Sequence, residues 1–248
     1  MGLKEITRRL ATRAGYVVHR WPANRFDAMD AALEMLAARG YRPRVVIDGG
    51  ANRGQWFAAA SRIFPNAAFH LVEPQDVCWP DLERAGAARG RTTVHHTALT
   101  APGVAAVLMT RGGDPGNTGA FVFTAAEGHA ADLESPATTL DALFASGVTR
   151  DDRVLLKLDI EGHEVEALRG ATAVLEKVEV IVCEVRFYDI HHSGRPEFAE
   201  VVAFLGARGF VLYDIDMLSS RPRDLRLRIG DVIFVRRGSP LAEDVASE

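Results

Sequence analysis

The chain lacks the features that mark secreted and membrane-spanning proteins. It has only two cysteines in 248 residues, Cys78 and Cys183, and their spacing matches neither a metal motif nor a disulfide framework. No apolar run approaches the roughly 18–20 residues that span a bilayer. Residues 1–15 contain no apolar stretch typical of a secretory signal. We therefore expect reduced thiols, no transmembrane segment and a cytoplasmic location.

A basic excess is also missing. The chain has 29 lysines and arginines against 33 aspartates and glutamates, which gives a net charge of −4. General nucleic-acid binders usually carry a positive excess that neutralises phosphates, so we predict no nucleic-acid partner. The sequence shows no internal repeat and no low-complexity segment.

Apolar, strand-like runs alternate with segments of helical periodicity along most of the chain. Strands are expected at 45–48, 68–73, 93–99, 153–159 and 178–185, with a closing pair at 210–215 and 231–237. Helices are expected at 26–39, 54–64, 79–88, 139–146, 163–175 and 196–208. This alternation predicts an α/β fold with a doubly wound, seven-stranded, mostly parallel sheet, whose last strand is antiparallel. Ligands of such sheets bind at the carboxyl ends of the strands, where the strand order reverses.

The first expected strand ends in an acid and a glycine-rich turn. Asn52 stands where the dinucleotide fingerprint G-x-G-x-x-G would need glycine. The carboxylate of Asp48 would repel a phosphate and attract an ammonium group, which favours an amino-acid-bearing nucleoside such as S-adenosylmethionine. Glu73 follows the second strand, where an acid can accept hydrogen bonds from both ribose hydroxyls. A purely structural turn, with a chance acid on the next strand, is the alternative.

A second cluster of polar residues lies in "LLKLDIEGHEVEALRGA" at 155–171. Acids and a histidine crowd the end of an apolar strand, which is costly unless a substrate, cation or metal offsets the charge. For Glu164 we favour a solvated helix N-terminus, where the helix dipole stabilises acids. For Asp159 and Glu161 we favour a functional site.

With its neighbours, this segment resembles the FkbM-type methyltransferases, a family of class I S-adenosylmethionine-dependent O-methyltransferases. The matching segments, in chain order, are "VVIDGGANRGQW", "LVEP", "HHTALT", "TTLDAL", "LLKLDIEGHEVEALRGA" and "VIVCEV". They cover about residues 45–185. The resemblance implies a Rossmann-like class I fold, which divides the chain into an N-terminal helical cap at 1–44 and a methyltransferase domain at 45–248.

The resemblance also implies roles for single residues. The turn after the first strand would wrap the methionyl part of S-adenosylmethionine, Glu73 would hold the ribose, and Thr97 would lie beside the adenine. The residues expected to bind the cofactor are Asp48, Gly49, Gly50, Ala51, Asn52, Gly54, Gln55, Glu73, Pro74, Thr97, Ala98 and Asp159.

A hydroxyl acceptor becomes a good nucleophile only when a base withdraws its proton. Asp159, His163 and Glu161 are the candidates for catalysis. A bound cation is another way to acidify a hydroxyl, and Asp159, Glu161 and Glu184 would offer oxygen ligands suited to Mg²⁺. No spacing in the sequence requires a metal.

The acceptor is the least defined part of the prediction. The resemblance points to a hydroxyl of a sugar, in a polysaccharide or glycolipid, or of a secondary metabolite. We expect its pocket to form from the glycine-rich segment 100–137, especially Asn117–Gly119, and from the loop 186–195; a homodimer is left open. Segment 100–137 is too short for a domain and too long for a plain connection, which indicates a functional loop or lid.

Two other functions remain open at this stage. A nicotinamide-dependent oxidoreductase would need the third fingerprint glycine and a hydride-transfer pair such as Tyr-x-x-x-Lys, neither of which the sequence contains. A non-catalytic nucleoside-binding protein would keep the fold but would not need Asp159 and Glu161 beside the site.

Overall fold

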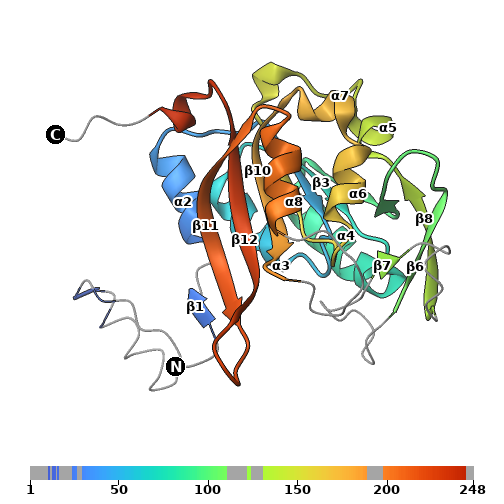
Figure 1. Ribbon diagram of the computed structural model, residues 1–248. Helices are drawn as coiled ribbons and strands as arrows, with labels where there is room; N and C mark the ends of the chain where they lie inside the picture. Colours follow the sequence, from blue (N-terminus) through green and yellow to red (C-terminus); the bar gives the residue numbers. More distant parts are fainter. Residues whose placement is uncertain are drawn as a thin grey trace.

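The computed structural model describes residues 11, 13–14, 16, 24–26, 30–110, 122–123, 131–188 and 198–243. These residues form a twisted central sheet with helices on both faces and a smaller sheet at its side (Figure 1). The strand order in the central sheet is β1-β11-β12-β10-β9-β2-β3-β4. No helix in this part of the chain is long and apolar enough to cross a membrane.

Parallel strands make up the half of the sheet that carries the glycine-rich turn. They are β2 (Val45–Gly49), β3 (Ala68–Val72), β4 (Thr92–His95), β9 (Val154–Leu158) and β10 (Val178–Arg186). β2 pairs with β3 on one side and with β9 on the other, so the strand order reverses between β2 and β9. The two segments that carry the most polar residues therefore end side by side at the point where such sheets bind ligands.

The closing strands complete the sheet as predicted. β12 (Leu227–Arg236) lies between β10 and β11 (Phe210–Ser220) and is antiparallel to both. The seven-stranded, mostly parallel sheet with an antiparallel last strand is confirmed. A further short strand, β1 (Asn24–Phe26), pairs with the outer edge of β11.

Within the region expected as a helical cap at 1–44, the described residues include a strand as well as a helix. A strand occupies 24–26, and helix α2 (Ala31–Ala38) begins five residues later than the expected helix at 26–39. The outer edge of β11 explains the strand, because an edge exposes unpaired backbone groups that a short segment can satisfy. Most of residues 1–23 lie outside the described part of the chain.

The remaining helices cover the two faces of the sheet. They are α3 (Gln55–Ile63), α4 (Trp79–Arg89), α5 (Leu140–Phe144), α6 (Glu164–Arg169), α7 (Thr172–Leu175) and α8 (Phe198–Gly206), with single 3₁₀ turns η1 (Asp76–Cys78), η3 (Arg150–Asp152) and η4 (Pro240–Ala242). The single helix expected at 163–175 is broken at Gly170. There a Cβ would lie 2.3 Å from the carbonyl oxygen of Thr100, and Asp141 accepts hydrogen bonds from the N–H groups of Ala173 and Val174. This cap starts α7 as a separate helix.

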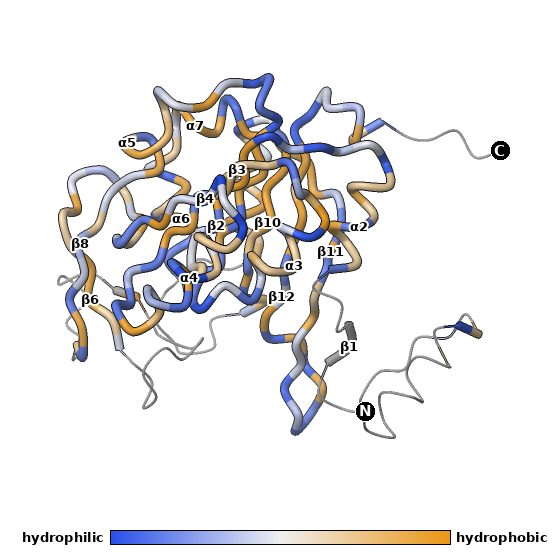
Figure 2. The backbone as a smooth tube through the Cα atoms, turned by 180° about the vertical axis from the view of Figure 1, so that it is seen from behind, coloured by the Kyte–Doolittle hydropathy of each residue, from blue (hydrophilic) through white to orange (hydrophobic). Residues whose placement is uncertain are grey.

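Neighbouring residues of one strand pack into two different hydrophobic cores, one on each face of the sheet. Leu155 belongs to the apolar cluster that includes α2 and α3, whereas Leu156 belongs to the cluster that includes α5 to α8. Successive side chains of a strand point to opposite faces, so a run of apolar residues indicates burial on both. Figure 2 shows hydrophobic backbone gathered at the centre of the molecule, around β10.

The described residues of segment 100–137 include three strands. It contains β6 (Ala106–Met109), β7 (Val122–Phe123) and β8 (Leu133–Thr138), which join β5 (Ala98–Leu99) in the second sheet. The strand expected at 93–99 is thus divided between the two sheets. β8 was not predicted, because "LESPAT" is polar and contains a proline. Asn117–Gly119 lies outside the described residues.

Candidate functional site

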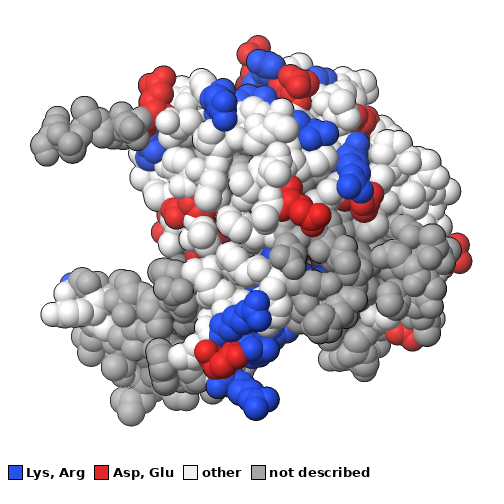
Figure 3. All heavy atoms as spheres, viewed as in Figure 1, with Lys and Arg blue, Asp and Glu red and all other residues white. Residues whose placement is uncertain are grey.

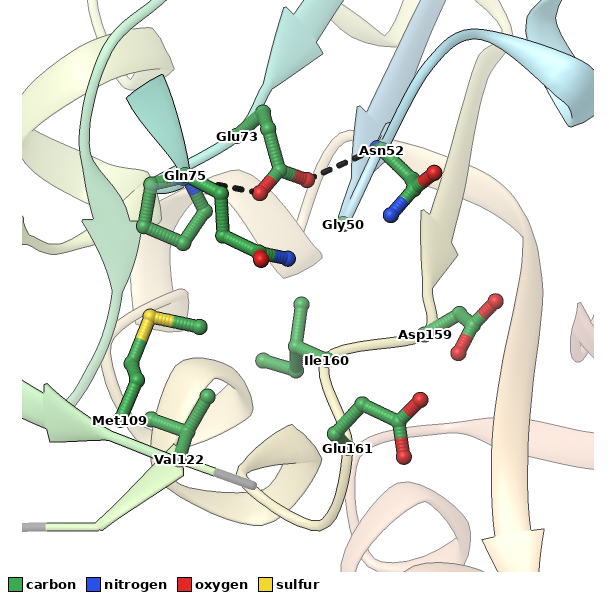
Figure 4. Close-up of a pocket in the computed structure, with 10 residues that line it drawn as sticks. Gly50, Asn52, Glu73, Gln75, Met109, Val122, Asp159, Ile160 and Glu161 are labelled. Carbon is green, nitrogen blue, oxygen red and sulfur yellow. Dashed lines mark hydrogen bonds between the residues drawn. The ribbon is translucent and has the colours of Figure 1, made fainter. Parts of the chain in front are cut away.

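The carboxyl ends of β2, β3 and β9 open onto one cavity of about 420 Å³, measured with its open mouth (Figure 4). Its walls are Gly50, Asn52, Glu73, Pro74, Gln75, Met109, Val122, Asp159, Ile160 and Glu161. Met109 and Val122 reach it from the second sheet, and the other residues follow the ends of the three parallel strands. The glycine-rich turn and the acidic segment therefore meet in one pocket.

The turn after β2 approaches β9 so closely that only glycine fits at one position. Gly50 has a φ of +78°, and a Cβ there would lie 1.9 Å from the carbonyl oxygen of Asp159. Asn52 also adopts a left-handed conformation, with φ +47°, which asparagine tolerates better than most residues. The N–H groups of Gly50 and Ala51 both donate to the carbonyl of Val72, which ties the turn to β3.

Glu73 forms one wall of the cavity and is held by the backbone. Its carboxylate accepts hydrogen bonds from the N–H of Asn52 at 2.7 Å and from the N–H of Gln75 at 2.9 Å. Burial raises the pKa of Glu73, while these two hydrogen bonds lower it. Each carboxylate oxygen has a second lone pair, so the group can still accept hydrogen bonds from a ligand.

A buried lysine lies behind the turn. The Nζ of Lys157 is 3.2 Å from Asp48 and 3.3 Å from Asp159, and it donates to the carbonyl of Gly50 at 3.1 Å. Burial lowers the pKa of Lys157, but the carboxylates of Asp159 and Asp48 outweigh it and the net shift is upward. Asp48 is fully buried and does not line the cavity. Its carboxylate faces Lys157, a partner that was not expected from the sequence.

Glu161 faces the cavity from a strained loop (Figure 4). Its φ is +58°, and that of Gly162 is +92°. Burial and the neighbouring carboxylates of Asp159 and Glu164 raise the pKa of Glu161 to about 8. The nearest opposing charge is the buried guanidinium of Arg186, 4.0 Å from the Glu161 carboxylate. A carboxyl with a pKa near neutrality is suited to proton transfer.

Glu164 and His163 support this loop from below. Glu164 accepts hydrogen bonds from the N–H groups of Ile160 and Gly162, and it is 7% exposed, so the expectation of a solvated helix N-terminus is wrong for this residue. The start of α6 is covered by the loop, and the carboxylate satisfies the loop's backbone instead of meeting water. His163 is equally buried, with its Nε2 2.9 Å from the hydroxyl of Thr100. It is not among the residues that line the cavity.

Several residues expected to bind the cofactor are not among those that line the cavity. They are Gly49, Ala51, Gly54, Gln55, Thr97 and Ala98. Gln55 donates to the side chain of Asn52 at 3.2 Å, and Thr97 donates to the carbonyl of Pro136 at 3.0 Å. Thr97 thus contacts the second sheet, which was not foreseen in the sequence.

Asp159, Glu161 and Glu184, the ligands expected if a metal is bound, are not placed to coordinate one ion together. Glu184 of β10 lies opposite Asp231 of β12, and burial with nearby carboxylates raises its pKa strongly. Within the described residues, no group of three or more His, Cys, Asp and Glu side chains is placed to hold a metal ion.

Gln75 is a cavity residue that the sequence did not reveal. It is 5% exposed, and its Oε1 has no hydrogen-bond partner among the described residues. Its position two residues after Glu73 was the only available signal. Met109 and Val122 were missed because their place in the cavity depends on the pairing of β6 with β7.

Comparison with known proteins gives a family match over the region that forms the site. The domain described as "Methyltransferase FkbM domain" matches residues 48–212. No curated protein sequence matches the chain at a significant level.

Several solved structures are similar to the chain at low identity. The methyltransferase FkbM from Methylobacillus flagellatus KT is 17% identical. The match covers 77% of this chain and 43% of that one, at a TM-score of 0.46. A 1,6-didemethyltoxoflavin-N1-methyltransferase from Burkholderia thailandensis, solved with bound 1,6-didemethyltoxoflavin and S-adenosylhomocysteine, is 15% identical; the match covers 86% of this chain and 80% of that one, at a TM-score of 0.47. An O-methyltransferase family protein from the same organism is 12% identical, with coverages of 85% and 55% and a TM-score of 0.46. The chain thus spans less than half the length of the first of these proteins.

Proposed function

The chain belongs to the FkbM methyltransferase domain family, and we propose that it transfers a methyl group from S-adenosylmethionine to a hydroxyl of a sugar or a secondary metabolite. The observation that carries this proposal is the single cavity shared by the Glu73 carboxylate and the Asp159 and Glu161 carboxylates. The first group can hold a nucleoside, and the other two can act on an acceptor placed beside it.

The residues of the cavity fit an adenosyl ligand. Gly50 lines the cavity, so a ligand there would meet the backbone of the turn rather than a side chain. Glu73 offers lone pairs to the ribose hydroxyls, and Gln75 has a buried amide oxygen that no described residue satisfies. S-adenosylmethionine would supply a methyl group on a positively charged sulfonium, and the acidic wall formed by Asp159 and Glu161 complements that charge.

Glu161 is the residue best suited to withdraw the acceptor's proton. Its raised pKa, about 8, is close to the working pH, where a general base is most effective. Asp159 is paired with Lys157 and is better suited to orient the hydroxyl for in-line attack. His163, bonded to Thr100 and buried under the loop, would position Glu161 rather than contact the acceptor.

The composition of the cavity wall supports a hydroxylated ring as the acceptor. Met109 and Val122 form an apolar surface across the cavity from Asp159 and Glu161, and Ile160 lies between the two sides. A sugar or a similar metabolite presents both a C–H face and a hydroxyl edge, so it can contact both walls at once. We propose such a small molecule or glycan as the substrate, with no metal required.

Calorimetry tests the cofactor part of the proposal. The wild-type chain is titrated with S-adenosylmethionine, S-adenosylhomocysteine and NAD⁺. Binding of the first two and not of NAD⁺ is expected, since the turn lacks the dinucleotide fingerprint. Preference for NAD⁺ would overturn the assignment in favour of an oxidoreductase.

A methyl-transfer assay tests the reaction. Methyl-labelled S-adenosylmethionine is incubated with the protein and with panels of sugars, glycolipids and hydroxylated metabolites, and the labelled product is examined by NMR. A label on oxygen supports O-methylation, whereas a label on nitrogen or carbon contradicts it. If the protein binds the cofactor but transfers the methyl group to no acceptor of these panels, a non-catalytic nucleoside-binding protein is favoured.

A further inference from the structure

An arginine-rich hairpin projects from the edge of the sheet that carries the cavity. Residues 221–226 connect β11 to β12, and the last paired residues are Ser220 and Leu227. β11 runs in the same direction as β10, since both are antiparallel to β12. The turn therefore lies at the carboxyl end of β11, beyond the body of the protein (Figures 1 and 2).

Short contacts connect this hairpin to the cavity wall. Arg186, at the end of β10, lies 4.0 Å from Glu161. The next residue, Phe187, donates to the carbonyl of Arg228 at 2.9 Å, and the guanidinium of Arg226 lies 3.8 Å from the ring centroid of Tyr188. The hairpin and the cavity are thus held on the same side of the molecule.

The hairpin carries a local excess of positive charge on an acidic protein. Arg221, Arg223, Arg226 and Arg228 are accompanied by one acid, Asp224. Asp224 forms an ion pair with Arg221. Arg223 and Arg228 have no ion-pair partner among the described residues. Figure 3 shows Lys and Arg side chains gathered at this tip around a single acidic group.

Leu225 adds an apolar group at the centre of this charge. Its side chain is 41% exposed, and it is one of the few large apolar residues exposed in the described part of the chain. Its φ is +59°, a left-handed conformation that a leucine rarely adopts. The turn holds it there with two backbone hydrogen bonds of 2.8 Å between Arg221 and residues Leu225 and Arg226.

We propose that residues 221–228 form a peripheral binding surface for an anionic lipid bilayer. The arginines would contact lipid phosphates, and Leu225 would enter the boundary between headgroups and acyl chains. A soluble polyanion would bind to the arginines alone, and an exposed leucine would not strengthen that binding. Because the hairpin lies on the cavity's side of the molecule, docking would bring the cavity close to the membrane surface. The proposal stands whether or not the acceptor is a lipid.

Vesicle binding tests this proposal. The full chain is sedimented with vesicles of phosphatidylcholine alone and of phosphatidylcholine mixed with phosphatidylglycerol. Binding is expected only to the mixed vesicles, and it should weaken with added salt because the charges are exposed. A juxtamembrane arginine contributes about fivefold to partitioning, so Arg223→Glu with Arg226→Glu should reduce binding by about 30-fold or more.

Matched variants distinguish binding through this hairpin from a general attraction between the protein's positive charges and the anionic vesicles. Arg150→Glu with Arg237→Glu makes the same charge change beside the amino end of β9 and the carboxyl end of β12, on the side of the sheet opposite the cavity. Both side chains are exposed, and this variant should bind vesicles as the wild type does. Leu225→Ser keeps every charge and should lower binding several-fold. If the double variant does not fold, Arg223→Glu alone replaces it in the experiment, because the Arg223 side chain has no described contacts.

Three results would overturn the proposal. One is a loss of binding in the variant Arg150→Glu with Arg237→Glu that equals the loss in the hairpin variant, which would indicate a non-specific effect of net charge. Another is unchanged vesicle binding in both Leu225→Ser and the hairpin charge variants. The third is binding to soluble polyphosphate as tight as to the vesicles and unaffected by Leu225→Ser, which would assign the hairpin to a soluble polyanion.

Discussion

The ammonium of Lys157 lies 3.2 Å from the carboxylate of Asp48, and both side chains are buried. The pair joins β2 to β9 at the point where the strand order reverses. It also places the ammonium 3.1 Å from the carbonyl of Gly50, so the turn that borders the cavity is fixed from behind. Lys157 is therefore a positioning residue, and Asp48 is its partner.

Removing the lysine charge should destabilise the fold. Lys157→Met leaves Asp48 buried without a counter-charge, and breaking a buried pair in this way typically costs about 3–5 kcal/mol. Urea denaturation measures the effect. The double variant Lys157→Met with Asp48→Asn should recover much of the loss, because Asp48 no longer carries a buried charge without a partner. A single variant as stable as the wild type would contradict the pairing.

Gly50 should tolerate no side chain. In Gly50→Ala the new Cβ would overlap the carbonyl of Asp159, so we expect a loss well above the roughly 1–2 kcal/mol that a left-handed alanine costs. Gly54→Ala is the matched control, because Gly54 also has a positive φ but its nearest contact would be 3.4 Å. Thermal melting of the two variants should place Gly50→Ala clearly below Gly54→Ala. Equal melting temperatures would refute the close approach.

Glu73 should contribute to cofactor affinity. Glu73→Ala removes the lone pairs offered to the ribose and should weaken binding of S-adenosylmethionine by about 1–3 kcal/mol. Glu166→Ala, which removes an acid bonded to Arg169 outside the cavity, should leave the affinity unchanged. Calorimetry on both variants provides the comparison. Unchanged affinity in Glu73→Ala would remove Glu73 from the site.

Asp159→Asn should separate chemistry from folding. The change keeps the shape of the side chain but removes the carboxylate that orients the acceptor's hydroxyl, and a misplaced acceptor can cost about 10²-fold or more in rate. Melting temperature, cofactor affinity and methyl transfer should be measured on one preparation. We expect a folded, cofactor-binding and nearly inactive protein. Full activity would exclude Asp159 from the mechanism.

The titration of Glu161 should appear in both activity and stability. As a base it must lose its proton, so the rate should rise with pH up to about 8, and Glu161→Gln should lack this rise. The folded pKa is raised above the unfolded value of about 4.5, so protonation favours the fold. The stability that Glu161 contributes is therefore complete below about pH 4.5 and is lost as the pH rises towards 8. Denaturation of wild type and Glu161→Gln across that range checks the sign, and a parallel pair of stability curves would contradict it.

Much of this fold follows from local patterns in the sequence. The apolar runs and the helical periodicity define the elements, because each side chain's direction depends on its own strand or helix. The acids after consecutive strands could be assigned to one edge, since parallel strands end on the same side of a sheet. For this reason Glu73, Asp159 and Glu161 were expected together, and the structure places them in one cavity.

The tertiary structure decided which distant groups meet. Asp48 was assigned to the ligand from its place at a strand end, but the pairing of β2 with β9 sets it against Lys157. Glu164 has the pattern of an exposed helix start, and the loop above it leaves its carboxylate buried against backbone N–H groups. Strand periodicity specifies the face on which a side chain lies and not the neighbour that it finds there. That neighbour is set by strand order and register, which depend on contacts between residues more than a hundred positions apart.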